Sequence, residues 1–226
     1  MVELISGLRA EVVRANLHAL RAEIDAAAMR APARGTGAVE ILAATKYVPL
    51  PELPVLAQAG VRLVGENRAQ DLQQKAAVYG DLFAWDFIGQ LQSRRVRTIV
   101  PHVRLIHSLA SESAVRELER SVALARPGLR VLLQVNVAGE QGKAGIHPRE
   151  IAGYIARCPL PVAGLMTMPP LAARPQENRR WFAALRELAD EHGLEHLSMG
   201  SSQDYLVAVE EGATIVRIGT RLYRGR

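Results

Sequence analysis

The stretch from residue 41 to 49 reads ILAATKYVP, and its apolar first half has the composition of a buried β-strand. The strand then ends in a charged residue, Lys46. Only three of the 28 basic residues of the chain are lysines, whereas the other 25 are arginines. A lysine amine, unlike an arginine guanidinium, can lose its proton and attack a carbonyl group. The position therefore indicates a need for an amine, and the alternative is a chance lysine at a strand end.

The pattern around this strand repeats along the chain. Segments with helical periodicity, such as residues 112–125 and 175–192, separate most of the apolar runs. Strands that alternate with helices favour a parallel sheet, and eight such units favour a (β/α)8 TIM barrel. We expect one α/β domain over residues 1–226, with an extra N-terminal helix over residues 3–30. The eight predicted strands begin near Val39, Val61, Phe83, Val103, Arg130, Val162, Glu195 and Thr214.

An open, doubly wound sheet is the second fold that this alternation permits. It is less favoured because no glycine-rich dinucleotide fingerprint follows the first predicted strand.

Composition excludes several classes of function. The net charge of +5 permits an anionic partner, but the basic residues are scattered and aromatic residues make up only 4% of the chain, so we expect no nucleic-acid role. The single cysteine, Cys158, has no disulfide partner and no metal-ligand spacing, which indicates a reducing compartment and no metal site. The first 20 residues carry charges within an amphipathic pattern, so we expect no signal peptide or membrane span and a cytoplasmic location.

In a barrel the reactive side chains lie at the carboxyl ends of the strands, and strands seven and eight often form a phosphate site. Here strand seven is predicted to end at Ser201 and Ser202, and strand eight at Gly219 and Thr220. Serine and glycine are also common at helix caps and tight turns, which is the alternative. A phosphate site opposite Lys46 would match the two attachment points of pyridoxal 5′-phosphate (PLP), a lysine and a phosphate cradle.

Arg217 lies two residues before the predicted phosphate glycine. From there its side chain can face the pyridine nitrogen of PLP, and its positive charge would oppose protonation of the ring. The alternative for Arg217 is an ion pair with a carboxylate such as Glu66.

Eight motifs follow one another from residue 41 onward: ATKYVP (44–49), GENRAQD (65–71), WDFIGQLQSRRV (85–96), IHSLAS (106–111), LLQVNVAGEQGKAGI (132–146), GLMTMPP (164–170), LSMGSSQD (197–204) and VRIGTRLY (216–223). Together, these motifs resemble the pyridoxal phosphate homeostasis protein family. The resemblance implies a PLP-binding barrel similar to the N-terminal domain of alanine racemase, without a firm enzymatic activity, that acts in the control of free PLP and of amino-acid and keto-acid balance.

The resemblance also assigns roles to residues of this chain. It implies that Lys46 forms the aldimine with PLP, that Arg217 faces the pyridine nitrogen, and that Lys143 matches a lysine that many members carry. The remaining residues implied to bind the cofactor are phosphate ligands at Ser201, Ser202, Gly219 and Thr220 and ring-lining residues at Asn67 and Met199.

The chain departs from the family pattern at five positions. The family has His at Asp86, an Asn-Lys pair at Arg94 and Arg95, Thr at Tyr47 and Met at Ser201. These departures bear on loop contacts and partner surfaces rather than on the lysine or the arginine.

Racemisation on PLP needs a base on each face of the substrate, and alanine racemases take the second base, a tyrosine, from a further domain. The sequence ends at Arg226, so we expect that domain to be absent. We therefore expect a monomeric PLP carrier that buffers or delivers the cofactor to apo-PLP enzymes, with weak or no catalysis. The alternatives are a PLP-dependent amino-acid racemase and a Schiff-base aldolase. We expect Lys143 to pass PLP on or to lie in a surface turn, and Lys75 to be a solvated surface residue.

Overall fold

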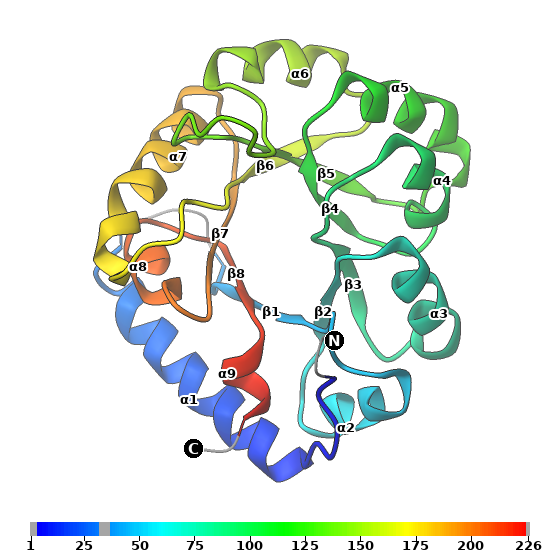
Figure 1. Cartoon of the computed structure of the whole chain (residues 1–226), viewed down its shortest axis with the longest axis vertical. Helices are drawn as coiled ribbons and strands as arrows, with labels where there is room; N and C mark the ends of the chain where they lie inside the picture. The colour runs from blue at the N-terminus through cyan, green and yellow to red at the C-terminus, as the bar shows by residue number, and fades with distance from the viewer. Residues whose placement is uncertain (1–3, 32–36, 225–226) are drawn as a thin grey trace.

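The computed structural model describes residues 4–31 and 37–224. Its eight parallel strands pair in chain order and close into a barrel, with β1 beside β8 (Figure 1). Each strand begins within two residues of its predicted start, so the barrel prediction is confirmed. The strands are β1 (Glu40–Ala44), β2 (Leu63–Glu66), β3 (Ala84–Phe87), β4 (Leu105–Leu109), β5 (Arg130–Gln134), β6 (Val162–Met166), β7 (His196–Ser201) and β8 (Ile215–Ile218).

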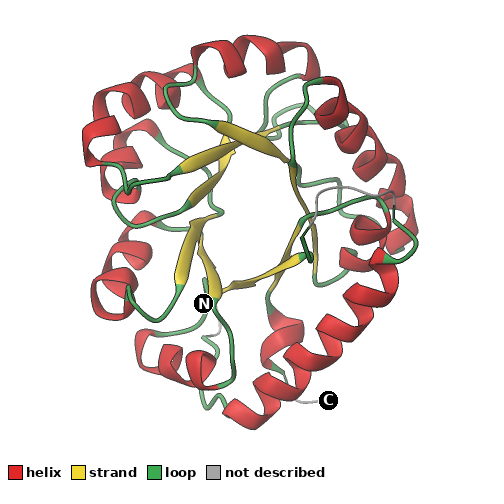
Figure 2. Cartoon of the chain, turned by 180° about the vertical axis from the view of Figure 1, so that it is seen from behind, coloured by secondary structure: helices red, strands yellow, loops and turns green. Residues whose placement is uncertain are grey.

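The helices form a ring outside the strands, which Figure 2 shows from the opposite side. The two short connections of the sequence, after β1 and after β3, are helical as well, each begun by a turn of 3-10 helix. The helices are α1 (Ala10–Ala28), α2 (Leu53–Gln58), α3 (Ala69–Tyr79), α4 (Val96–Ile99), α5 (Glu112–Ser121), α6 (Ile151–Arg157), α7 (Arg179–Glu191), α8 (Tyr205–Glu210) and α9 (Thr220–Tyr223).

Two apolar layers hold this arrangement together. Successive strand residues point to opposite faces, so one set fills the barrel and the other packs against the helices. On β1, Leu42 belongs to the inner layer, and Ile41 and Ala43 belong to the outer one. The buried members of the inner layer are Leu42, Leu63, Leu105, Leu132, Met166 and Ile215.

The first helix begins later than its periodicity predicts. Residues 4–9 form neither helix nor strand, and residue 3 lies outside the described residues. The carboxylate of Glu52 accepts hydrogen bonds from the backbone N–H groups of Gly7 (2.7 Å) and Leu8 (3.1 Å), and the Ile5 N–H donates to Tyr47 O (2.8 Å). Long-range bonds of this kind compete with a local helix, and sequence periodicity cannot reveal them.

From Ala10 onward, α1 packs beside α8 and α9 and so covers the outside of the last βα units (Figure 1). Across residues 4–31 and 37–224, no helix combines the length and the apolar character that crossing a bilayer requires.

Candidate functional site

Lys46 lies just beyond the carboxyl end of β1. Because side chains alternate along a strand, Lys46 continues the inward-facing series of Leu42 and Ala44. Its side chain is exposed, and its Nζ lies 4.7 Å from the centroid of the Tyr47 ring, a cation–π contact. The structure therefore places an accessible amine at the mouth of the barrel.

A buried ion pair supports the strand end that carries this lysine. Lys75 Nζ donates to Glu66 Oε1 (2.5 Å) and to the backbone oxygen of Thr45 (2.9 Å), and the Thr45 hydroxyl donates to the same Glu66 oxygen (2.6 Å). Burial raises the pKa of Glu66, and the neighbouring Lys75 ammonium offsets part of that rise. The peptide that precedes Lys46 is thus tied to both β2 and α3.

The prediction that Lys75 is a solvated surface residue is wrong. Lys75 lies on the buried face of α3, three residues after Leu72 and six after Ala69. That spacing was the available signal, because residues three apart on a helix share a face.

The loops after β7 and β8 meet as the sequence predicts. The hydroxyl oxygen of Ser202 accepts a hydrogen bond from the Gly219 N–H (3.1 Å), which joins the two loops directly. Thr220 follows as the first residue of α9, with an exposed side chain. The backbone N–H and the hydroxyl of Ser201, by contrast, both donate to Asp204 Oδ1 (2.7 and 3.0 Å), so this serine serves as a turn residue in the structure.

Arg217 lies inside the barrel, with only 8% of its surface exposed. Its Nη1 donates to the backbone oxygen and the hydroxyl of Ser198 (2.8 and 2.7 Å). Its Nη2 donates to Thr167 O (3.0 Å) and Met168 Sδ (2.9 Å). Within the described part of the chain, these bonds use four of the five N–H groups of the guanidinium, and the fifth, on Nε, has no acceptor.

The structure does not bear out the alternative of an ion pair between Arg217 and Glu66. Glu66 is committed to Thr45 and Lys75 instead. Burial lowers the pKa of Arg217 to about 10, and the negative charge of Asp204 offsets part of this decrease. A guanidinium with this pKa stays protonated at neutral pH, so the barrel interior holds a fixed positive charge.

The register of the sheet brings the lysine and the arginine together. β1 pairs with β8 so that Leu42 lies opposite Arg217. Neighbouring strands are about 4.8 Å apart, and each residue adds about 3.3 Å along a strand. Lys46 and the pair Gly219 and Thr220 therefore leave the barrel at adjacent positions, above Arg217.

The two predicted ring-lining residues have different locations. Asn67 follows β2 and carries a buried Oδ1 with no hydrogen-bond partner in the described residues, so an acceptor is available there. Met199 is fully buried in the outer apolar layer, as is Leu197, whereas Ser198 between them faces the interior. Asn67 thus lies at the carboxyl end of β2 with an acceptor free, whereas Met199 packs outside the barrel interior.

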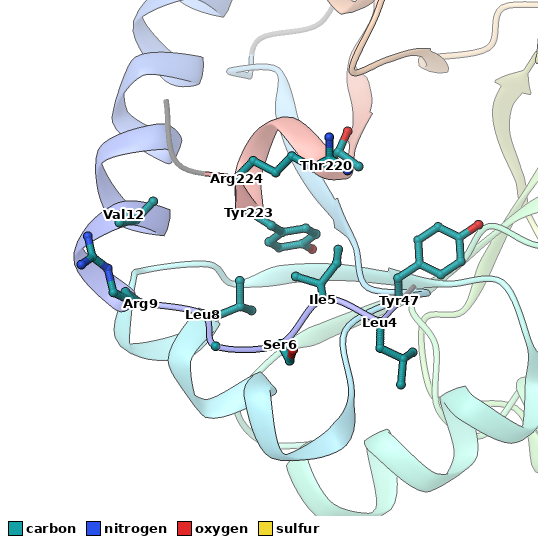
Figure 3. Close-up of a pocket in the computed structure, with 11 residues that line it drawn as sticks. Leu4, Ile5, Ser6, Leu8, Arg9, Val12, Tyr47, Thr220, Tyr223 and Arg224 are labelled. Atoms are coloured by element: carbon teal, nitrogen blue, oxygen red, sulfur yellow. The ribbon is translucent and has the colours of Figure 1, made fainter. Parts of the chain in front are cut away.

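A pocket of about 650 Å³ lies between the N-terminal segment and α9 (Figure 3). Tyr47, Thr220 and Tyr223 line one side of it, and residues 4–9 line the other. A second pocket, of about 570 Å³, also contains Thr220 and adds Ser202.

Two of the other residues singled out by the sequence lie outside the barrel, and a third, Asp86, lies inside it. Lys143, in the loop after β5, is half-buried and forms an ion pair with Glu140. Arg94 is exposed on the 3-10 turn before α4. Asp86 is fully buried inside the barrel. Among the described residues, no three His, Cys, Asp or Glu side chains come close enough to hold a metal ion.

Comparisons with known proteins define first the class and then the family. The sequence-family model of the alanine racemase N-terminal domain matches residues 10–226 of this chain. The alanine racemase of Corynebacterium glutamicum shares the fold, with a TM-score of 0.65 at 15% identity over 96% of this chain and 61% of its own. The barrel is thus of the alanine racemase N-terminal type.

Proteins with higher sequence identity to this chain identify its family within that class. The pyridoxal phosphate homeostasis protein of Aquifex aeolicus is 40% identical over 204 residues, which cover 85% of this chain and 90% of that protein. The structure of PipY from Synechococcus elongatus with PLP bound has a TM-score of 0.77 and 30% identity, and it covers 94% of this chain and 100% of its own. The chain belongs to the pyridoxal phosphate homeostasis protein family.

Proposed function

We propose that this protein binds PLP at the mouth of the barrel and takes part in PLP homeostasis as a buffer or carrier with weak or no catalysis. The observation that carries the proposal is the register of β1 and β8, which sets Arg217 opposite Leu42, four residues before Lys46. The Nε–H of Arg217 has no acceptor among the described residues, and the joined loops of Ser202 and Gly219 leave the barrel on the same side. The similarity to PipY with PLP bound supports the same ligand.

The residues present fit the chemistry of PLP. When bound, PLP supplies an aldehyde that condenses with amines. Lys46 offers the amine, and the Nε–H of Arg217 would donate to the pyridine nitrogen and keep it unprotonated. The uncommitted Oδ1 of Asn67 offers an acceptor near the ring. We assign the phosphate to Ser202, Gly219 and Thr220.

Ser201 and Met199 complete the proposed set, in less direct roles. Ser201 is held by Asp204, so we assign it to the shape of the phosphate loop. Met199 supports that loop from the outer layer.

The positions of three tyrosines support weak or absent turnover. A racemase needs a second base opposite the lysine. The Tyr205 hydroxyl donates to Glu23, and the Tyr223 hydroxyl donates to Ala44 O (3.1 Å). Tyr47 packs its ring against the Lys46 ammonium itself. Deuterium exchange at Cα of alanine should therefore be slow, and rapid exchange that depends on Lys46 would support a racemase instead.

Visible spectroscopy tests the ligand and the lysine. The purified protein should show the absorption band of lysine-linked PLP after PLP is added, and Lys46→Ala should lose it. Lys143→Ala is the matched control and should retain the band. A protein without the band, or a band that survives Lys46→Ala, would contradict the proposal. A colourless protein that borohydride traps only with a substrate would point to an aldolase.

Delivery is a separate part of the proposal. We propose that apo-PLP enzymes in the cytoplasm receive the cofactor, that Lys143 assists its release, and that the protein acts as a monomer. Lys143→Ala should bind PLP normally but reactivate an apo-enzyme more slowly than the wild type. Equal reactivation rates would show that Lys143 has no part in PLP release. Sedimentation of the PLP-loaded protein would test whether it is a monomer.

A further inference from the structure

A line of polar side chains, partly exposed at its outer end and fully buried from Asp86 inward, crosses the barrel interior below Arg217. It begins at the amino-terminal end, where Arg104 pairs with Glu40 through both Nη atoms (2.8 and 2.7 Å). Arg104 also donates to both oxygens of Asp86 (2.9 and 3.1 Å). His107 Nε2 lies 3.1 Å from Asp86 Oδ2, and its Nδ1 lies 2.8 Å from the hydroxyl of Ser198. That hydroxyl accepts a hydrogen bond from Arg217.

Simple donor and acceptor rules assign the donor in each hydrogen bond between Arg217 and Asp86. A carboxylate such as Asp86 only accepts, so His107 must carry its proton on Nε2. Nδ1 then accepts from the hydroxyl of Ser198. The Ser198 hydroxyl keeps its proton and donates it in this hydrogen bond, and its oxygen lone pairs accept the Nη1–H of Arg217. All of these bonds run in one direction, from Arg217 to Asp86.

Burial is the main reason that His107 stays neutral. Burial lowers the pKa of His107 most, and the positive charges of Arg217 and Arg104 lower it further, while Asp86 raises it. Asp86, His107 and Ser198 are all fully buried, so water does not reach them to exchange these roles. Only one neutral tautomer of His107 therefore fits the site.

We propose that Asp86 is a positioning residue, which acts through His107 and Ser198 to hold Arg217 with its Nε–H free for the ligand. Asp86 selects the tautomer of His107, and in that tautomer Nδ1 accepts a hydrogen bond from the Ser198 hydroxyl. The serine oxygen then anchors Nη1 of Arg217, while Thr167 and Met168 anchor Nη2. The inference rests on the proposed function for the identity of the ligand, but the proton arrangement is a property of the free protein.

Asp86→Asn tests this line of hydrogen bonds because it keeps the shape of the side chain and replaces one acceptor atom with a donor. An asparagine has one acceptor oxygen and one donor nitrogen in place of two acceptors. If the nitrogen faces Arg104, two donors oppose each other. If it faces His107 instead, Nε2 must accept and the proton moves to Nδ1. The Ser198 proton then loses its buried acceptor, and the anchor of Arg217 is weakened.

Nitrogen NMR of the PLP-free protein reads the tautomer directly. The wild type should carry the His107 proton on Nε2, and Asp86→Asn should move it to Nδ1. Asp86→Glu keeps a carboxylate and should retain the Nε2 proton. Asp81→Asn, at an exposed carboxylate, is the control for loss of charge and should change nothing. Retention of the Nε2 proton in Asp86→Asn would overturn the proposal.

A titration with PLP measures how each substitution changes the binding affinity for PLP. Asp86→Asn should weaken binding about tenfold, and Asp81→Asn should bind like the wild type. Ser198→Ala keeps the pair of Asp86 and Arg104 and provides a second route if Asp86→Asn does not fold. It should also weaken binding about tenfold while the proton stays on Nε2. Unchanged binding in a folded Ser198→Ala would overturn the proposal.

The two proposals can fail separately. If the wild type does not bind PLP, the proposed function fails, whatever the tautomer of His107. If the wild type binds PLP through Lys46 but neither variant changes the affinity, only the positioning role of Asp86 fails.

Discussion

The buried pair of Lys75 and Glu66 gives the sharpest stability prediction. Lys75→Met removes the charge and keeps the length of the side chain. Glu66 is fully buried, and its Oε2 has no hydrogen-bond partner among the described residues even in the wild type. Removing one partner of a buried ion pair costs about 3–5 kcal/mol of unfolding free energy. Loss of the hydrogen bond to Thr45 O adds about 1 kcal/mol.

The pH dependence of this cost follows from the pKa of Glu66. Burial already raises that pKa above the ordinary value of 4.5, and removal of the Lys75 charge raises it further. A raised pKa means that the protonated form fits the folded state, so the variant loses stability as the pH rises above 4.5. Each pH unit costs at most about 1.4 kcal/mol, hence about 1.4 kcal/mol at pH 5.5 and no more than about 5 kcal/mol at pH 8.

Urea denaturation at pH 5.5 and pH 8 measures this difference. Lys75→Met should be much more destabilised at pH 8. Lys143→Met is the matched control, because its ion pair with Glu140 is partly exposed and is worth about 1 kcal/mol or less. The double variant with Glu66→Gln should recover stability at pH 8. An equal loss at both pH values would refute the charge argument and leave only packing.

Two further predictions concern the backbone near the site. Gly200 has φ +89°, and an added Cβ would lie 2.6 Å from the Cβ of Ala208, so Gly200→Ala should cost about 1–3 kcal/mol of unfolding free energy, measured by urea denaturation. An unchanged midpoint would contradict this. Glu52→Ala should free the backbone N–H groups of Gly7 and Leu8, and their hydrogen exchange should quicken while exchange in β1 is unchanged. Protection that persists would show that other contacts hold residues 4–9.

Much of the candidate site followed from local pattern. Lys46 was found because an apolar run ended in a lysine in a chain with few lysines. The meeting of Ser202 with Gly219 followed from strand order, because parallel strands of a barrel place their carboxyl ends on one rim. Periodicity alone could not place Met199, since the choice between the two faces of a strand depends on its register.

Other features were beyond sequence reasoning because they depend on partners far away in the chain. The late start of α1 depends on Glu52, which lies more than 40 residues from the amides that it binds. Lys75 is a different case: its spacing from Leu72 signalled the buried face of α3, and only its pairing with Glu66 needed the structure. Asp86 was visible only as a departure from the family pattern, and its contacts with Arg104 and His107 appear only when β3 and β4 are paired.

The amino-acid sequence by itself determined the alternation of strands and helices, the closed barrel and the rim on which the polar loops gather. These depend on short-range periodicity and on the pairing of successive strands, which local order carries. Only the tertiary structure decided which buried charges and polar groups face each other. Those choices are made in the buried interior, where water is excluded and a polar atom without a partner is costly.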